Sequence, residues 1–555
     1  MKNIQHIILL MLAFSFIACE NDELDELRNK NNRNETVVLP ELTSGTADFS
    51  NYVALGASFT AGFTDGGLFR AGQERSFPKL LSEQFAFAGG GTFTQPLLDE
   101  NTGGILAGGT PTPFGYRLVF GGAGPVPLNA FLASQNLPVP PITSEATNNI
   151  GSDFNNFGIP GAKSFHLVTP GYAAFNPYYT RIASSASSTV LADALAQNPT
   201  FFTLSEIGGN DILQYATSGG TGVDQTGNTD PSTYNTNDIT DPNVFAQAFS
   251  SMITALTQNN AKGAVTNVPD ITSLSHFTTV PYNPLDPNDE DTGAGLRAQI
   301  PTLNQIYGAL NQIFAVADPS RIITFSTTET NPVVIKDENL IDLSGAIAAT
   351  LAPDPNFAAF IGQFGLPPAA ATQVAGFLGA TYGQARQATV NDLLVLPSSS
   401  IIGKPNENVA AALAALLPPQ VAAQFSVEGV TLPLEDKWVL TPQEQNAIAV
   451  ATSAYNTTIK NITDANPNVA LADLRAVLEQ AATSGYPYDD FILNTNLVFG
   501  GLVSLDGIHL TSKGYGLMAR EFLVAIDNAF GSNFIASGKT PAAANLPTNY
   551  SPIIQ

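Results

Sequence analysis

Two short motifs at opposite ends of the chain constrain the fold most, because their side chains complete one chemical unit only if they meet. Gly56-Ala57-Ser58-Phe59 follows the apolar run Tyr52 to Leu55, and Asp506-Gly507-Ile508-His509 lies near the C-terminus. A serine hydroxyl becomes a nucleophile when an imidazole accepts its proton, and a carboxylate holds that imidazole in the required tautomer. The motifs therefore predict a triad of Ser58, His509 and Asp506.

Two glycine-containing motifs lie between them in the sequence. They are Asn156-Phe157-Gly158-Ile159-Pro160-Gly161-Ala162 and Gly208-Gly209-Asn210-Asp211. The largely apolar stretch Thr200 to Ile207 predicts a buried strand that ends in a turn at the second motif. Because ligands of open α/β sheets bind outside the carboxyl ends of the strands, we expect Ser58, Gly161 and Asn210 to share one crevice. Donors placed there suit the stabilisation of an oxyanion.

The four motifs together resemble those of the SGNH or GDSL-like lipases and esterases, and they occur in that family's order. Ala57 stands where the family usually has Asp, and Phe59 where it usually has Leu. The resemblance covers the motifs and their flanking strands, and it implies that Ser58 is the nucleophile, His509 the general base and Asp506 its orienting carboxylate. It also implies an oxyanion hole made by the backbone N–H groups of Ser58 and Gly161 and the side-chain amide of Asn210.

The succession of strand, helix and strand through these motifs predicts an α/β fold. We expect a three-layer α/β/α, SGNH-hydrolase-like domain over residues 50–530, with a parallel sheet between helices and a C-terminal tail at 531–555. Ser58 should begin the helix that follows the first strand. We expect a helix from Thr441 to about Asp464, because Thr441-Pro442-Gln443-Glu444 is typical of a capped start. A strand from Val469 to Leu474 should follow it.

Three long insertions are expected within this domain. Residues 65–150 are rich in glycine and proline and predict a loop region over the mouth of the pocket, and residues 219–243 predict a polar surface excursion. Residues 341–424 are unusually apolar: between Ile341 and Ala385 the only charges are Asp342 and Asp354. Short apolar helices there could form a cap that holds an acyl chain, or a helical subdomain that serves stability alone.

The first 18 residues predict a signal peptide, with Lys2 ahead of a largely apolar stretch from Ile7 to Ala18. Phe16-Ile17-Ala18-Cys19 resembles a bacterial lipoprotein signal, in which Cys19 is lipidated; a simple secretory signal is the alternative. Residues 19–49 predict a polar, disordered tether. Its acidic start, Glu20 to Glu26, resembles the surface-export signals of Bacteroidetes lipoproteins and favours attachment to the outer membrane, with display at the cell surface as one outcome.

Composition limits the partners of the chain. Of its 555 residues, 47 are Asp or Glu and 22 are Lys or Arg, which gives a formal charge of −25. Such a charge disfavours nucleic acid, because no basic surface is available to neutralise phosphates. Residues 286–291 (Asp-Pro-Asn-Asp-Glu-Asp) lack the glycine and terminal glutamate of a helix-loop-helix calcium site, so we expect a solvated acidic loop. No metal and no cofactor is expected at the active site.

The chemistry of the motifs favours a carboxylic ester hydrolase that works through an acyl-enzyme. Its expected partners are an ester substrate, either an acyl lipid or an acylated glycan, and a membrane that it reaches through its N-terminal lipid. The apolar insertion favours the acyl lipid. Two alternatives are a carbohydrate (acetyl) esterase that acts on surface glycans and a non-catalytic surface binding lipoprotein on a hydrolase scaffold. His166 and His276 are interpreted as ordinary loop or core residues.

Overall fold

The structure is a computed structural model that describes residues 38–415 and 417–554. The expected signal peptide, Cys19 and most of the expected tether lie outside these residues. Residues 42–535 and 539–554 form one compact unit, which contains every element discussed below. None of the helices in the described part of the chain has the length and apolar character needed to cross a membrane.

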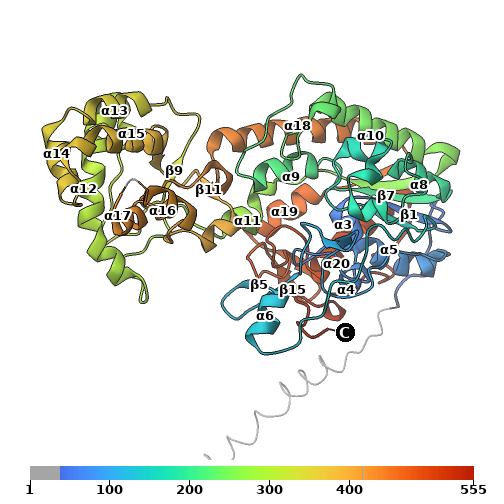
Figure 1. Cartoon of the computed structure of the whole chain (residues 1–555). Helices are drawn as coiled ribbons and strands as arrows, with labels where there is room; N and C mark the ends of the chain where they lie inside the picture. Colours follow the sequence, from blue (N-terminus) through green and yellow to red (C-terminus); the bar gives the residue numbers. More distant parts are fainter. Residues whose placement is uncertain (1–37, 416, 555) are drawn as a thin grey trace, which may run out of the picture. The chain divides into compact units, whose positions relative to one another are not determined.

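A five-stranded, wholly parallel sheet, of which Figure 1 labels β1 and β7, forms the core of the larger part of this unit. The strands lie in the order β13-β8-β7-β1-β6, which in order of sequence is 5-4-3-1-2 and is typical of doubly wound sheets. The chain passes from β1 to β6 on one side of β1 and then returns to β7 on the other side. In doubly wound sheets the ligand-binding crevice lies where the strand order reverses in this way. The five strands are β1 (Tyr52–Gly56), β6 (Asn156–Gly158), β7 (Phe201–Ser205), β8 (Lys262–Thr266) and β13 (Val469–Ala472).

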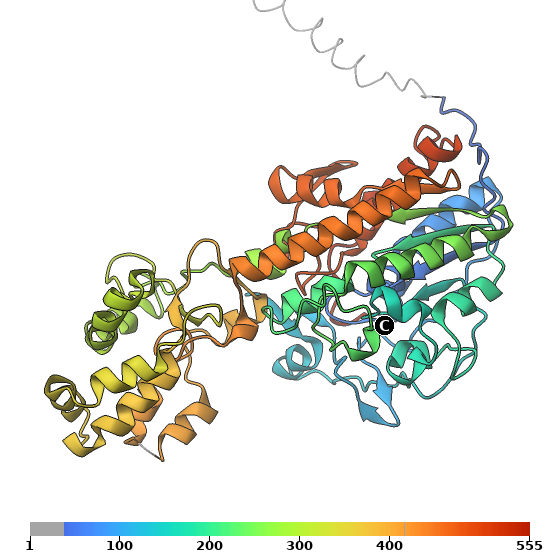
Figure 2. The same ribbon diagram turned by 90° about the horizontal axis from the view of Figure 1, so that it is seen from above.

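Helices cover both faces of the sheet. Neighbouring strand residues such as Val53 and Ala54 belong to two different core clusters, because successive side chains of a strand point to opposite faces. On one face lie α8 (Val190–Ala196), α9 (Asn210–Thr217), α10 (Pro242–Leu256), α18 (Pro442–Asp464) and α19 (Leu474–Thr483). On the other lie α5 (Phe77–Phe85) and α20 (Ser512–Phe530). The predicted α/β class with a parallel sheet is confirmed, and Figure 2 shows α10 and α18 side by side over the sheet.

Local sequence explains these elements. All five residues of β1 and all five of β7 are buried, as expected for central parallel strands that are covered on both faces. Helix α18 begins at Pro442, and the Glu444 carboxylate accepts a hydrogen bond from the Thr441 backbone N–H at 2.6 Å. The predicted helix from Thr441 to about Asp464 is thus confirmed. The strand expected to end at Leu474 ends at Ala472.

The segment from 65 to 150 contains small hairpins and short helices rather than one extended loop. Its anchor is Arg117, which is fully buried and donates hydrogen bonds to the carbonyl oxygens of Asn101 and Ser551. Besides α5, which packs on the sheet, the elements are α4 (Arg70–Gln73), the hairpin β2 (Leu106–Ala107) and β3 (Thr110–Pro111), the hairpin β4 (Leu118–Phe120) and β5 (Pro125–Pro127), and α6 (Leu128–Ser134).

A second group of helices, which we call the helical unit, has its own hydrophobic core (Figure 1). That core extends from Val280 to Val439, so the unit is larger than the predicted insertion at 341–424. The difference arises mainly from α12 (Gly293–Ala317), which buries Ile300, Leu303 and Ile306 on one side. The other elements are α13 (Ser344–Leu351), α14 (Pro355–Gly362), α15 (Ala371–Tyr382), α16 (Glu407–Leu413), α17 (Pro419–Gln424), and the pairs β9 (Val334–Lys336) with β10 (Ala385–Gln387) and β11 (Leu393–Leu394) with β12 (Val439–Leu440).

The packed core also reaches beyond the expected range of 50–530. Phe49 and Phe534 are both buried, and their rings meet at 5.5 Å in the cluster beneath the sheet. Leu546 belongs to the same cluster, and Tyr550 packs its ring against Phe69 at 5.0 Å. The last part of the expected tether and much of the expected tail therefore belong to the folded unit, because their apolar side chains pack in its core.

Candidate active site

Ser58, His509 and Asp506 form one hydrogen-bonded chain. Ser58 is the first residue of α3 (Ser58–Ala61), directly after β1, and its Oγ lies 2.9 Å from Nε2 of His509. Nδ1 of the same imidazole lies 2.7 Å from Oδ2 of Asp506. This is the arrangement in which an imidazole can take the serine proton while a carboxylate stabilises the resulting charge. The structure thus brings together the three residues that the sequence assigned to the triad.

Asp506 accepts several hydrogen bonds besides the one from the His509 imidazole. Its Oδ1 accepts hydrogen bonds from the backbone N–H groups of Ile508 and His509, both at 2.9 Å, and its Oδ2 accepts one from Gly66 at 2.9 Å. Burial alone would raise the pKa of Asp506, but His509 and these donors hold that pKa well below its usual range. The carboxylate therefore stays ionised.

The His509 ring is also held by its aromatic neighbours. The rings of Phe63 and Phe59 lie 4.5 Å and 5.6 Å from the imidazole, centre to centre. The loop itself needs Gly507, which has a φ of 77° and whose added Cβ would come within 2.8 Å of the His276 backbone nitrogen. Packing and the loop backbone thus fix the imidazole between its two hydrogen-bond partners.

Glu206 supports the turn that carries the nucleophile. It follows β7 directly, and both of its carboxylate oxygens lie 2.8 Å from the backbone nitrogen of Phe59. Thr60 donates a further backbone hydrogen bond at 3.3 Å. A carboxylate at this point satisfies N–H groups that have no partner within the first turn of a helix. Glu206 itself has a φ of 54°, a left-handed conformation that is uncommon for residues other than glycine.

Glu206 should make stability depend on pH. Burial raises the pKa of Glu206 from 4.5 to about 7, against the opposing effect of the Phe59 and Thr60 donors. Because the folded state holds this proton more tightly, its contribution to the free energy of unfolding is present below pH 4.5 and is lost as the pH rises to about 7. We expect Glu206→Gln, which keeps an acceptor but cannot ionise, to lose less thermal stability than the parent protein over that interval. Melting temperatures from pH 4 to 9 measure this, and parallel curves for the two proteins would contradict it.

The predicted oxyanion donors are placed only in part. Ser58 and Asn210 line the same pocket. One N–H of the Asn210 amide donates to the Ala162 carbonyl at 2.9 Å, so the amide is oriented by the residue after Gly161. Gly161 has a φ of 78°, which favours glycine, but it is not among the residues that line the pocket. Its assignment, like the role of the Ser58 N–H, stays a prediction.

Asp211 joins the two glycine-containing segments. Its carboxylate accepts hydrogen bonds from the Ser164 backbone N–H at 2.9 Å and from the Ser164 hydroxyl at 2.7 Å. Both partners lie on the segment after Gly161 and not on the turn that carries Asp211. Asp211 therefore helps to place Asn210 relative to Gly161 and is engaged by Ser164.

His166 and His276 are held by packing and by hydrogen bonds within the fold. His166 accepts a hydrogen bond from the Lys163 backbone N–H and stacks on the Tyr172 ring at 4.4 Å, and burial lowers its pKa to about 4. The His276 backbone N–H donates to the Gly507 carbonyl at 3.0 Å. Burial lowers the pKa of His276 as well. His276 is buried and His166 is half-buried, and neither is among the residues that line the pocket, which agrees with their interpretation as ordinary loop or core residues.

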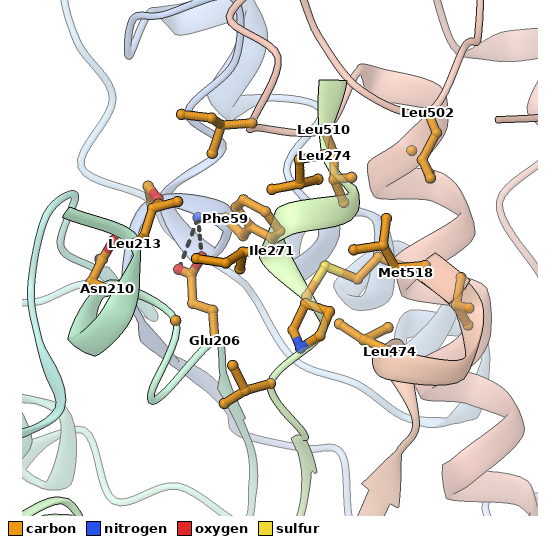
Figure 3. A pocket seen from close by; sticks show the side chains of 18 of the residues that line it. Phe59, Glu206, Asn210, Leu213, Ile271, Leu274, Leu474, Leu502, Leu510 and Met518 are labelled. Carbon is orange, nitrogen blue, oxygen red and sulfur yellow. Dashed lines mark hydrogen bonds between the residues drawn. The ribbon is translucent and has the colours of Figure 1, made fainter. Parts of the chain in front are cut away.

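Ser58 lines a mainly apolar pocket with a cavity volume of about 100 Å³. Figure 3 shows Glu206 and Asn210 on one side of this pocket. Its polar edge holds Ser58, Glu206 and Asn210. The rest is formed by hydrocarbon side chains from α3, α9, the loop between β8 and α11 (Ser275–Thr278), α19, α20 and the loop before α20. The apolar lining residues are Phe59, Leu213, Val268, Pro269, Ile271, Leu274, Leu474, Val477, Leu478, Leu502, Ile508, Leu510, Leu517 and Met518. Such a pocket suits a hydrocarbon chain attached to a reacting polar group.

The helical unit does not supply this lining. No residue of 341–424 and none of 65–150 is among the residues that line the pocket. The hypothesis that the apolar side chains of the 341–424 segment hold an acyl chain is therefore wrong for this pocket, because those side chains are used within the unit's own core. The alternative interpretation, a helical subdomain with a packing role, fits the structure. The 65–150 segment contacts the site at its start, where the Gly66 N–H binds Asp506.

Sequence reasoning missed two acids beside the triad. Glu206 could have been noticed as an acidic residue that ends an apolar strand just before Gly208-Gly209. Asp65 has no comparable signal: it is buried, its Oδ1 accepts from the Leu505 N–H at 3.1 Å, and its main-chain N–H donates to the Ser504 hydroxyl. Burial raises the pKa of Asp65 to about 7. Asp65 thus braces the strand-like segment that leads to Asp506.

Comparisons with family models, with curated proteins and with solved structures return no match for this chain.

Proposed function

We propose that this protein is a serine esterase that hydrolyses carboxylic esters through an acyl-enzyme on Ser58. The observation that carries the proposal is the continuous chain from Ser58 Oγ through His509 to Asp506, with distances of 2.9 Å and 2.7 Å. His509 would take the serine proton during attack and return it to the leaving alcohol, and water would then release the acid. The strand order and the motif order both support an SGNH-hydrolase-like fold.

The shape of the site supports an apolar acyl group. The attacking oxygen lies at the polar end of the pocket, so the acyl carbonyl would sit beside Asn210 while its chain enters the hydrocarbon-lined part. In Figure 3, Leu474 and Met518 lie on the side of the pocket opposite Asn210. Each buried methylene contributes roughly 0.8 kcal/mol of transfer free energy, which favours esters of medium or long chain over acetyl esters.

A chain-length series tests this proposal. We expect kcat/KM for nitrophenyl esters to rise from acetyl through butyryl to octanoyl, because longer chains bury more surface in the pocket. Leu474→Trp should fill the far part of the pocket and lower octanoyl turnover about tenfold or more while acetyl turnover changes little. Ala449→Leu, a substitution on the outer face of α18, is the matched control. Acetyl preference would favour the carbohydrate esterase instead, and no turnover of any ester would contradict the proposal.

The non-catalytic alternative is not favoured by any observation at the site. It would be favoured by a blocked pocket or by a Ser58 and a His509 too far apart to interact, whereas Ser58 lines an open pocket and lies within hydrogen-bond distance of His509. It also gives no reason for a carboxylate with five donors behind the imidazole.

Attachment to the outer membrane through a lipid on Cys19 is the second part of the proposal. Cys19 is the only cysteine of the chain. In bacterial cells, we expect the full-length protein in the membrane fraction and Cys19→Ala in the soluble periplasmic or secreted fraction. Mass spectrometry of the N-terminal peptide should show the acyl groups on Cys19. An unmodified Cys19 in a soluble protein would favour the simple secretory signal.

A further inference from the structure

Three acidic side chains from separate segments meet at the first turn of α18. Glu338 follows β9, Asp436 begins a short 3-10 helix (Asp436–Trp438), and Glu444 is the third residue of α18. Each offers one carboxylate oxygen, and these oxygens lie within 4.8 Å of one another. Two oxygen ligands of one Ca²⁺ ion are at most about 5 Å apart, because each lies about 2.3–2.6 Å from the ion. The three carboxylates thus have the spacing of a single cation site.

Two oxygens of this cluster are buried without a partner. The Glu444 side chain is only 4 % exposed, and while its Oε2 accepts from the Thr441 N–H, its Oε1 has no hydrogen-bond partner among the described residues. Oδ1 of Asp436 is likewise buried and unpartnered within the described part of the chain. Buried carboxylate oxygens without donors are costly, and metal coordination is one of the few ways in which proteins satisfy them.

The nearby basic side chains do not balance the cluster. Lys437 pairs with Glu435, and Arg386 pairs with Asp337 and Asp392, both at 2.7 Å. Lys336 lowers the pKa of Asp436 through its positive charge, but a single lysine cannot neutralise three carboxylates. Burial, followed by close contact with the Glu338 carboxyl, raises the pKa of Glu444, and charge repulsion between the two carboxylates adds to this shift. A cation with two positive charges would relieve this repulsion.

We propose that Glu338, Asp436 and Glu444 bind a Ca²⁺ ion that ties the helical unit to the first turn of α18. The ligands are all carboxylates, which hard cations prefer, and the cluster contains none of the nitrogen or sulfur ligands that favour zinc or copper. Ca²⁺ accepts irregular carboxylate sets, whereas Mg²⁺ demands a near-octahedral shell and gives up its water reluctantly. The site is separate from the triad, so it does not depend on the proposed esterase activity.

Trp438 provides a built-in reporter for this site. It is the only tryptophan of the chain and lies two residues after Asp436. Titration of the metal-stripped protein with CaCl₂ should give a saturable change in Trp438 emission, with a Kd of about 10⁻⁴ M. Tb³⁺, which takes the place of Ca²⁺ on carboxylates, should show luminescence sensitised by Trp438 that Ca²⁺ displaces. At ten times the Kd, Ca²⁺ should raise the Tm by about 1–4 °C.

Matched variants decide whether the three carboxylates are responsible. Glu338→Gln is at an exposed position and should fold normally, yet it should weaken the Ca²⁺ response at least tenfold, as should Glu444→Gln. Glu407→Gln, an exposed acid on α16 of the same helical unit, should respond like the parent protein. An absent response up to 10 mM (about 100 times the expected Kd), an unchanged response in Glu338→Gln, or equal responses to Mg²⁺ and Ca²⁺ would overturn the proposal.

Discussion

Ser58→Ala should lower kcat for ester hydrolysis by at least about 10⁴-fold, because the attacking atom is lost while the rest of the site remains. Ser58 Oγ is the only hydroxyl that lies within hydrogen-bond distance of His509 Nε2 among the described residues. The substitution removes a single oxygen from a mostly buried side chain, so we expect the Tm to change by no more than a few degrees. Steady-state rates with an octanoyl nitrophenyl ester measure the loss.

The control for this prediction is Ser251→Ala. Ser251 is exposed on α10, and its hydroxyl donates only to the Gln247 carbonyl of the same helix. Its removal should leave kcat unchanged, because alanine favours helix and no contact with the site is involved. If Ser58→Ala retained the parent rate while Ser251→Ala also did so, the nucleophile would have to be sought elsewhere.

Asp506→Asn should lower kcat by about 10⁴-fold with little change in KM. An asparagine has nearly the same shape, but it cannot stabilise a positively charged imidazole, and its amide N–H₂ would face donors such as the Gly66 and Ile508 N–H groups. The resulting repulsion favours the wrong tautomer of His509. Rates measured across pH 5 to 10 should therefore show the largest loss near neutrality and partial recovery at high pH.

Asp193→Asn is a matched control for this second prediction. Asp193 is also a buried carboxylate that accepts several hydrogen bonds, among them those from the Tyr179 and Ser184 hydroxyls. Its replacement should lower the Tm while kcat stays near the parent value, since it lies outside the pocket lining. A comparable loss of kcat in both variants would mean that Asp506 acts through the stability of the fold and not through His509.

The elements that local sequence determines were predictable. Strand β1 is a short, wholly apolar run followed by a glycine, and α18 begins with proline and an acid in its first turn. The pair of Asp506 and His509 was predictable because both residues lie in one four-residue motif. Ser58 was then predicted from the order in which the four motifs occur along the chain. Each of these signals lies within a few residues of chain.

The parts that depend on contacts between distant segments were not predictable. The local sequence marks Glu206 only as an acid after an apolar stretch, and its contact with the backbone of Phe59 joins segments 147 residues apart. The helical unit includes α12 because this helix packs with later helices, although α12 lies before the segment 341–424 in the sequence. The three carboxylates of the proposed cation site are spread from 338 to 444, and nothing in the sequence marks them as neighbours.

Covalent capture of the nucleophile tests the central claim most directly. A fluorophosphonate reacts only with a serine that a neighbouring base activates, so it reports the working triad and not the mere presence of Ser58. Peptide mass spectrometry should locate one adduct on Ser58, with labelling lost in His509→Ala and slowed by an octanoyl ester. An unlabelled Ser58 in the folded protein, or equal labelling of Ser58 in His509→Ala, would contradict the account.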